Sequence, residues 1–435
     1  MIDIRIIREN FEEYKKVCER RGCPVSLETI FELDKNSRQL AQEVDALRAE
    51  RNRLSKECQT NPAARDQVKA LKVDLSTKEN TLNELQDKLM KMLAFLPNQL
   101  AADVPNGLDD TDNVELRKVG TIPTFDFPVR DHQQLGELLD IIDTQRGAKV
   151  AQTGFYYWKG KGAQLAQALF FWTQQQLVNR GFTLFMTPCV AKERTLYGTG
   201  YLPFFADQTF NIKDTELALI GTSEQTLVGY HADDVLDGKD LPLCYTAYTP
   251  CFRTEAGSYG KASKGIFRVH QFHKVEQIIF CKPEDSVKYH DFCLENEEYL
   301  LQQLGIPYHV VNVCVGDMGA PGYKKYDIEA WFAGFGGYRE VTSNTNLTSF
   351  QARRLNIRYK DGDTRDFVHT ISATAVTDRV LVAILENNQQ ADGTVIVPEV
   401  LRPLCGFDKI EPKNKYIRFL SLQKVFAGVF EEIEF

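Results

Sequence analysis

Two runs of apolar residues at alternating spacings of three and four residues constrain the fold of this chain most strongly. The first run comprises Ile30, Leu33, Leu40, Val44, Leu47 and Leu54. The second run comprises Val68, Leu71, Leu75, Leu82, Leu85, Leu89 and Met92. Ser37 and Arg51 fill positions of the first run, and Lys78 interrupts the second. The break between them, Gln59–Pro62, ends in a proline, which cannot continue a helix. We therefore predict two heptad helices over about 27–95 that fold back as an antiparallel hairpin, each about 45 Å long.

The break between the predicted helices is surrounded by basic residues. Residues 48–72 contain seven of them against three acids. The basic residues are Arg48, Arg51, Arg53, Lys56, Arg65, Lys69 and Lys72. A basic tip on a long arm suits binding of a phosphate backbone, and the net charge of −8 does not exclude this because local charge decides. The residues alone leave open a dimerisation coiled coil with an ordinary solvated face.

The rest of the chain predicts a separate α+β domain. Residues 99–125 are rich in Pro, Asp, Asn and Gly and are expected to link an N-terminal domain (1–98) to a second domain (126–435). In the second domain, helices are expected at 162–180 and 286–304. Strands are expected at 183–186, 243–248, 275–281, 309–313, 326–332 and 395–398. Short connections between strands favour an antiparallel sheet with helices against it.

Several classes of protein are excluded by missing patterns. No stretch approaches 18 apolar residues and the N-terminus has no apolar signal core, so we expect a cytoplasmic protein without a membrane segment. The ten cysteines form no CxxC pair, and the histidines form no HExxH, so reduced thiols and no zinc are expected. The sequence has no GxxxxGK[ST] loop and no strand-flanked GxGxxG, so neither a P-loop nor a dinucleotide-binding fold is supported.

The stretch 247–281 is predicted to form a strand, a charged loop and a second strand. Arg253 and Glu255 are expected on one face because strand side chains alternate. The loop contains three glycines and two lysines, which suits closure over an anion. The second strand carries Arg268, His270, Phe272 and Glu276 at even spacings. This surface offers an arginine for phosphate, an acid for amino or hydroxyl groups and an aromatic plane for a base. The alternative is a solvent-facing hairpin with charge pairs across it.

The same stretch resembles motif 2 of the seryl-tRNA synthetases, TPCFRxEAG…G(I/L)xRxHQFxKVE, and the similarity extends over nearly the whole chain. The other similar segments are 180–203 (motif 1, with Pro188 as the motif proline at the dimer interface), 221–224 (TxE), 338–354 (EVSS…SN), 367–389 (motif 3) and 397–403. The resemblance implies a class II synthetase catalytic domain with an antiparallel sheet, preceded by a tRNA-binding helical arm.

The resemblance also implies an ATP site. In it Arg253 holds the α-phosphate and Glu255 the adenine, Phe272 stacks on the adenine ring, and Arg379 reaches the γ-phosphate. Both arginines are implied to be catalytic. The implied ATP-binding set is Arg253, Thr254, Glu255, Phe272, Glu340, Val341, Thr342, Ser343 and Arg379. Glu340 and Ser343 are also the implied ligands of Mg²⁺, a hard cation that prefers oxygen.

The implied serine site comprises Thr222, Ser223, Glu224, Glu276 and Thr374. Motif 3 departs from the family form HTLNGT or HTLNGS: it has Ser372 and Ala373 and is one residue shorter. Thr374 contacts the substrate side chain only if the gap lies after it. A second departure, at 345–350, removes an acid from the family's SNCTDF segment.

Three hypotheses follow from these observations. The first is a homodimeric serine–tRNA ligase that binds ATP, L-serine and serine tRNA, with selenocysteine tRNA as a further candidate partner. The second is a paralogue that loads a different amino acid or acceptor, which the altered motif 3 keeps open. The third is a catalytically inactive tRNA-binding homologue, which the retained arginines and acids oppose.

Overall fold

The computed structural model describes residues 2–58, 61, 63–256 and 265–412. The chain divides into two compact units, Met1–Gln99 and Leu100–Phe435. None of the helices in the described part of the chain combines the length and apolar character needed to cross a lipid bilayer.

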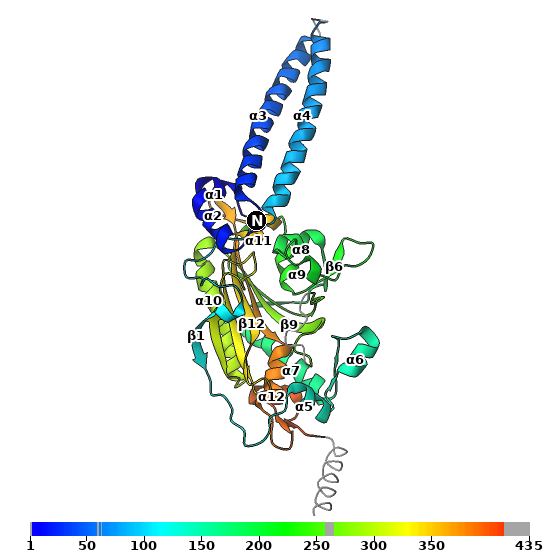
Figure 1. Cartoon of the computed structure of the whole chain (residues 1–435), viewed down its shortest axis with the longest axis vertical. Coiled ribbons are helices and arrows are strands. Elements are labelled where there is room, and N and C mark those ends of the chain that lie inside the picture. The colour runs from blue at the N-terminus through cyan, green and yellow to red at the C-terminus, as the bar shows by residue number, and fades with distance from the viewer. Residues whose placement is uncertain (1, 59–60, 62, 257–264, 413–435) are drawn as a thin grey trace, which may run out of the picture. The chain divides into compact units, whose positions relative to one another are not determined.

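The first unit is helical and contains the predicted hairpin. Its helices are α1 (Ile4–Glu9), α2 (Phe11–Arg20), α3 (Leu27–Glu57) and α4 (Ala63–Leu93). Ser26 caps α3, its side chain accepting a hydrogen bond from the backbone N–H of Thr29 at 3.1 Å. The two long helices lie side by side and antiparallel (Figure 1). The hairpin is confirmed, although residues 59, 60 and 62 of the predicted break lie outside the described residues.

Ion pairs join the two long helices where the heptad pattern is interrupted. Lys78 pairs with Glu43 at 2.6 Å, and Arg48 pairs with Glu79 at 2.8 Å. At the other end of the hairpin, apolar residues of α3 and α4 form one buried cluster with α1 and α2. The polar position in the second heptad run therefore forms a cross-helix contact rather than a gap.

The second unit is built on an eight-stranded sheet with strand order β1-β10-β11-β12-β15-β9-β8-β4. Its strands are β1 (Val114–Val119), β4 (Thr183–Phe185), β8 (Leu243–Phe252), β9 (Gln271–Cys281), β10 (Tyr308–Asn312), β11 (Lys324–Phe332), β12 (Gly337–Thr348) and β15 (His369–Thr377). All neighbours are antiparallel except β4 and β8, which are parallel. The predicted α+β class with an antiparallel sheet is confirmed.

Helices and small sheets complete this unit. The helices are α5 (His132–Leu138), α6 (Thr144–Ala151), α7 (Lys161–Asn179), α8 (Glu193–Thr199), α9 (Glu224–Gly229), α10 (Ser286–Gln303), α11 (Phe350–Leu355), α12 (Asp378–Asn387) and α13 (Arg402–Cys405). The remaining strands are β2 (Ile142–Asp143), β3 (Tyr157–Trp158), β5 (Val190–Lys192), β6 (Leu217–Leu219), β7 (Val235–Asp237), β13 (Arg358–Asp361), β14 (Thr364–Phe367), β16 (Val395–Ile396) and β17 (Lys409–Ile410).

Strand β9 is an inner strand of the sheet, between β15 and β8, and is buried on both faces. Val275 and Ile279 belong to the main hydrophobic cluster, which also contains residues of α7, α10 and α12. Ile278 and Phe280, which point to the opposite face, pack in a second cluster with α9 and α11. Helices on both faces thus hold this strand rigidly, and it carries Phe272 and Glu276 at its N-terminal half.

The segment 99–125, expected to be a linker, contributes a strand to the sheet. Residues 114–119 form β1, which pairs with β10 at the edge of the sheet. Every side chain of β1 is exposed or half-buried, so the strand lacks the apolar alternation by which a strand is recognised. The Pro, Asp and Asn residues before this strand also indicated a loop, so the strand was not predicted. From Leu100 onward this segment is therefore part of the second unit.

Buried His290 and half-buried His369 predict an acid-sensitive fold. Burial lowers the pKa of His290 to about 4, and it lowers the pKa of His369 to about 4 as well. Between pH 6.5 and 4 the unfolded chain therefore binds more protons, and stability falls with decreasing pH, by up to roughly 3 kcal/mol for His290. His290→Gln keeps a donor for the carbonyl of Asn344, 3.1 Å from Nε2. We expect this variant to show a flatter fall of the urea midpoint between pH 6.5 and 4; a slope equal to that of the wild type contradicts the assignment.

Candidate functional site

A cavity of about 570 Å³ opens over the centre of the large sheet. It is bordered by β8, β9, β12, β15 and the start of α12. Eleven of the fourteen residues assigned to ATP and serine line it: Glu224, Arg253, Glu255, Phe272, Glu276, Glu340, Val341, Thr342, Ser343, Thr374 and Arg379. The structure thus gathers side chains from segments more than 150 residues apart in the sequence.

Three of the assigned residues lie behind the wall of the cavity. Thr222 and Ser223 are fully buried at the start of α9, and the hydroxyl of Thr222 donates to Oε1 of Glu276 at 2.8 Å. Thr254 turns away, with its hydroxyl donating to the carbonyl of Asp207 and its N–H to the carbonyl of Gln208 at 3.1 Å. Their side chains support the lining residues and do not themselves face the cavity.

Arg253 is held at the end of β8. Its backbone N–H donates to the carbonyl of His270 at 3.0 Å, and Nη2 donates to the carbonyl of Gly221 at 3.4 Å. The guanidinium carbon lies 5.2 Å from the ring centroid of Phe272. A cation and an aromatic face are therefore adjacent, as a nucleotide that folds its phosphates back toward its base requires.

The other arginine, Arg379, approaches from the start of α12. Its Nη1 donates to the carbonyl of Glu340 at 2.8 Å and pairs with the carboxylate of Glu340 at 3.1 Å. Its guanidinium carbon lies 4.5 Å from the ring centroid of Phe267. Desolvation would raise the pKa of Glu340, but the charge of Arg379, followed by those of Lys325 and Arg253, lowers that pKa below its usual value. Glu340 is thus an ionised carboxylate among cations.

Glu276 forms the acidic floor of the site and is only 1 % exposed. It accepts the hydrogen bond from Thr222 and forms an ion pair with Lys274. Nearby Glu224 accepts hydrogen bonds from the hydroxyl of Tyr201 at 3.0 Å and from Nε2 of Gln351 at 2.6 Å. These fixed carboxylates can receive an ammonium group without further rearrangement.

The alternation of side chains along the strands predicted only some of the residues that line the cavity. Arg268, Phe272 and Glu276 line the cavity, but His270 does not. Strand β9 begins at Gln271, so residues 265–270 are irregular and do not alternate. Glu255 likewise follows the end of β8 and has φ 51°, yet it faces Arg268, with Oε2 and Nη1 2.5 Å apart.

Two lysines of the site, buried Lys274 and half-buried Lys325, were missed from the sequence. Lys274 and Lys325 both line the cavity. Lys274 has the same parity in β9 as Phe272 and Glu276, so alternation alone could have identified it. Lys325 pairs with Asp327 at 2.8 Å on β11, which no motif of the sequence indicated.

The altered motif 3 lies on β15, and both Ser372 and Thr374 line the cavity. Thr374 is paired with Glu276 of β9, and Val376 with Val275, so Ala375 sits at a bulge between them. A bulge re-aims the side chains around it. The hydroxyl of Thr374 is therefore placed beside the acid of the predicted serine site.

The seven basic residues assigned to tRNA lie at the end of α3 and the beginning of α4. Side chains at Lys56, Arg65, Lys69 and Lys72 are exposed. Arg53 is paired with Glu50 at 2.5 Å and with Glu57 at 2.7 Å. The positive charge is thus partly offset by neighbouring acids on the same helix.

The fold and the site together define a class of protein. An antiparallel sheet whose central strands carry an arginine, an aromatic ring and acids, with a second arginine at the start of a helix behind it, is the catalytic core of a class II aminoacyl-tRNA synthetase. Residues 208–388 match the family described as tRNA synthetase class II core domain (G, H, P, S and T), and residues 1–100 match the seryl-tRNA synthetase N-terminal domain.

Comparisons over the whole chain identify the family within this class. The serine–tRNA ligase of Dictyoglomus thermophilum is 43% identical over 426 residues, which is 95% of this chain and 100% of the relative. Seryl-tRNA synthetase from Pyrococcus horikoshii, solved with ATP, has a TM-score of 0.89 and 39% identity over 95% of this chain and 100% of its own. The cytoplasmic enzyme of Naegleria fowleri, solved with AMP, has a TM-score of 0.85 and 30% identity over 95% and 99%. The chain belongs to the seryl-tRNA synthetase family.

Proposed function

We propose that this protein activates L-serine with ATP to seryl-adenylate and transfers the seryl group to the 3′ end of serine tRNA. The observation that carries this proposal is the joint placement of Arg253, Phe272, Arg379 and Glu276 around one cavity. The match of the whole chain to serine–tRNA ligases supports it.

The cavity residues suit an in-line displacement at phosphorus. The carboxylate of serine attacks the α-phosphorus and pyrophosphate leaves, so no protein nucleophile is needed. Arg253 would offset the charge that develops on the α-phosphoryl oxygens, and Arg379 that on the leaving pyrophosphate. Glu276 would hold the ammonium group of serine. The terminal adenosine hydroxyl of tRNA then attacks the mixed anhydride and releases AMP.

Glu340 and Ser343 fit the requirements of a Mg²⁺ site. Both line the cavity on β12 and present a carboxylate and a hydroxyl oxygen. Within the described ranges, no group of three or more His, Cys, Asp or Glu side chains could hold a metal ion. Mg²⁺ does not need such a cage, since it is commonly bound by one or two carboxylates together with substrate phosphates. When bound, the ion would neutralise charge on the phosphates of ATP.

Pyrophosphate exchange with a panel of amino acids tests the proposed activity. We expect exchange that depends on serine and that is at least a hundredfold weaker with alanine, because a buried polar site rejects analogues that lack the hydroxyl. Exchange with a different amino acid would support the hypothesis of a paralogue with another substrate. That hypothesis rests on the changed motif 3 residues Ser372 and Ala373. Absence of exchange with every amino acid would support the inactive homologue.

The helical arm is proposed to bind serine tRNA outside the anticodon. Replacing Arg51, Arg53 and Arg65 with alanine removes three charges near the tip, and each phosphate contact contributes about 0.9 to the salt dependence of binding. We expect weaker binding of a serine tRNA transcript and a slope of log K against log salt that is smaller by up to about 3. Titrations at several salt concentrations measure this.

The matched control for the arm replaces Lys35, Lys88 and Lys91, which are exposed at the opposite end of the same helices. It removes the same charge and should leave the salt slope within about 0.5 of the wild-type value. Equal losses from both triple variants, or no loss from the first, would contradict the arm assignment. The same titration with selenocysteine tRNA tests the further candidate partner.

Apolar side chains around motif 1 support a homodimer. Phe171 and Val178 of α7 and Leu184 of β4 are about half exposed, and Met186 is fully exposed. Strand β4 is also an edge of the large sheet. An exposed apolar group beside a sheet edge is typical of a contact with a second copy.

The cytoplasmic location expected from the sequence remains part of this proposal.

A further inference from the structure

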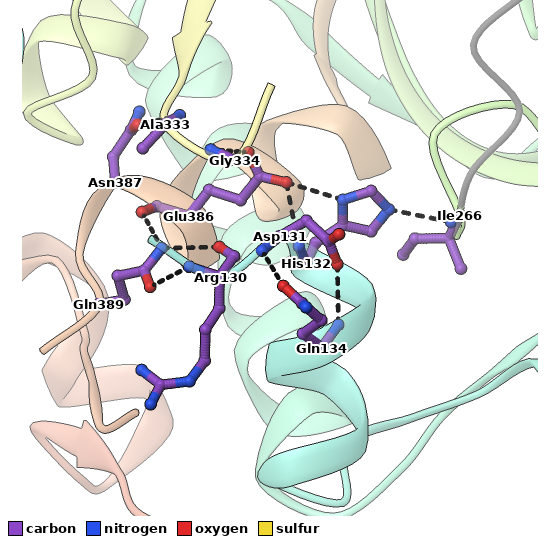
Figure 2. Close-up of polar contacts among 10 residues, drawn as sticks. All are labelled: Arg130, Asp131, His132, Gln134, Ile266, Ala333, Gly334, Glu386, Asn387 and Gln389. Carbon is purple, nitrogen blue, oxygen red and sulfur yellow. Dashed lines mark hydrogen bonds and ion pairs between the residues drawn. The ribbon is translucent and has the colours of Figure 1, made fainter. Parts of the chain in front are cut away.

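A buried pair of side chains lies outside the cavity and is not explained by the reaction. His132 is the first residue of α5, and Glu386 is near the end of α12; both side chains are at most 1 % exposed (Figure 2). Oε1 of Glu386 accepts from the backbone N–H of His132 at 3.0 Å and lies 2.8 Å from its Nδ1. Oε2 of Glu386 accepts from the N–H of Gly334 at 2.8 Å.

The surroundings fix where the imidazole proton resides. The backbone N–H of Ile266 points at Nε2 of His132, at 3.2 Å (Figure 2). An N–H can only donate, so Nε2 must accept and cannot carry a proton. The proton is therefore on Nδ1, where it is donated to the carboxylate of Glu386. One neutral tautomer satisfies both bonds, and the other places two N–H groups against each other.

The segment held by His132 is part of the wall of the ATP cavity. Ile266, Phe267 and Arg268 all line it. The carbonyl of Phe267 accepts from Nε of Arg379 at 3.4 Å, and Arg268 pairs with Glu255. His132 thus binds the residue directly before Phe267, which contacts Arg379. Arg268, the partner of Glu255, is the next residue along the chain.

The fit around the imidazole leaves little room for adjustment. Gly265 has φ +67°, and a Cβ there would lie 2.1 Å from Nε2 of His132. On the other side, the ring of His132 stacks on Phe335 with centroids 6.0 Å apart, and Phe335 packs against Phe267 at 5.1 Å. A larger residue than glycine at 265 would push the segment away from the imidazole.

Backbone contacts also fix His132 itself. Asp131 and Gln134 form a capping box at the start of α5. The amide of Gln389 accepts from the N–H of Arg130 at 2.9 Å and donates to the carbonyls of Arg130 and Glu386, each at 2.8 Å (Figure 2). Helix α12 thus holds the imidazole through Glu386 at one end and carries Arg379 at the other.

We propose that His132 is a positioning residue for ATP: through Nε2 and the N–H of Ile266 it anchors Ile266–Arg268 so that this segment meets Arg379, Glu255 and the nucleotide. This inference rests on the proposed function. A histidine that only packs in the core would affect stability and both substrates alike. An anchor of this wall affects the interaction with ATP and leaves the serine pocket on β9 and α9 unchanged.

Two amide substitutions separate these roles. In His132→Asn the side-chain NH₂ can take the place of Nδ1 and donate to Glu386, but no atom reaches the N–H of Ile266. In His132→Gln the longer amide can place its oxygen near the position of Nε2 and accept from Ile266. The first variant removes the anchor, and the second is the matched control that keeps it at similar polarity.

The experiment measures pyrophosphate exchange as a function of ATP and of serine, together with amide hydrogen exchange of residues 265–268. For His132→Asn we expect KM for ATP to rise about three- to tenfold, as the loss of one hydrogen bond implies, with KM for serine unchanged within twofold and faster exchange at Ile266. For His132→Gln, KM for ATP, KM for serine and the exchange rate at Ile266 should each stay within about twofold of the wild-type value.

Two outcomes would overturn the inference: a wild-type KM for ATP and wild-type protection of Ile266 in His132→Asn, or equal increases of both KM values in the two variants. Absence of serine-dependent exchange in the wild type would overturn the proposed function instead. In that event ATP binding by calorimetry and protection of Ile266 still test the anchor, since neither requires turnover.

Discussion

Replacing Arg253 with alanine is expected to lower serine-dependent pyrophosphate exchange by two to three orders of magnitude, the usual effect of removing one preorganised donor from developing charge. Arg253 is held between the carbonyl of Gly221 and the ring of Phe272. Its guanidinium therefore needs no reorganisation to meet the α-phosphate. Exchange assays at saturating serine measure the loss, and binding of serine tRNA should stay within about threefold of the wild-type value.

Two further variants control this prediction. Arg253→Lys keeps the charge but loses the planar fork, so it should recover only part of the activity. Arg365→Ala removes an exposed arginine of β14 that does not line the cavity and should leave exchange unchanged. Arg253→Ala with more than a tenth of wild-type exchange would show that this arginine is not the α-phosphate ligand.

The second large effect is expected for Glu276→Gln. Glutamine keeps the shape of the side chain and the hydrogen bond from Thr222, and it removes the negative charge that would meet the ammonium of serine. A hydrogen bond to a charged group contributes about 1.5–3 kcal/mol, so KM for serine should rise roughly 10- to 100-fold. KM for ATP should change less than threefold, because Glu276 is assigned to the ammonium group of serine and to none of the phosphates. Exchange kinetics with serine and ATP varied separately measure both constants.

A strand carboxylate outside the cavity provides the control for Glu276. Glu329 of β11 pairs with His309 at 2.7 Å and does not line the cavity. Glu329→Gln should therefore leave both KM values unchanged. If Glu276→Gln binds serine as tightly as the wild type, the ammonium group is received elsewhere, with Glu224 as the next candidate.

Local periodicity predicted the hairpin and strands β8, β9, β10 and β11, because each of those elements buries an apolar face. The two strands at the centre of the sheet, β12 and β15, were not predicted as strands. Helices α3 and α4 bury residues such as Ile30 and Leu89 at heptad spacing. Strand β1 was missed because pairing with β10 defines it and its side chains stay in solvent. A strand of this kind depends on a partner almost 200 residues away, which no local window contains.

Site residues that belong to a sequence motif could be predicted. Those whose place in the site depends on the tertiary structure were harder to predict. Arg253, Phe272 and Arg379 meet as the resemblance implied. His270 was misplaced because the irregular run before Gln271 breaks the alternation on which its assignment rested. Lys325 could not be found because its place in the cavity wall depends on the tertiary structure, in which it is half-buried and paired with Asp327. His132 gave no signal either, since its partners Ile266 and Glu386 come from distant segments.

We propose that one cavity holds ATP in a bent pose between two arginines, with serine against Glu276. A crystal structure with a non-hydrolysable seryl-adenylate analogue, followed by one with ATP, tests it most directly. We expect adenine stacked on Phe272, the α-phosphate on Arg253, the γ-phosphate within reach of Arg379, and the serine ammonium at Glu276. Nucleotide bound away from Phe272, or phosphates that touch neither arginine, would contradict it.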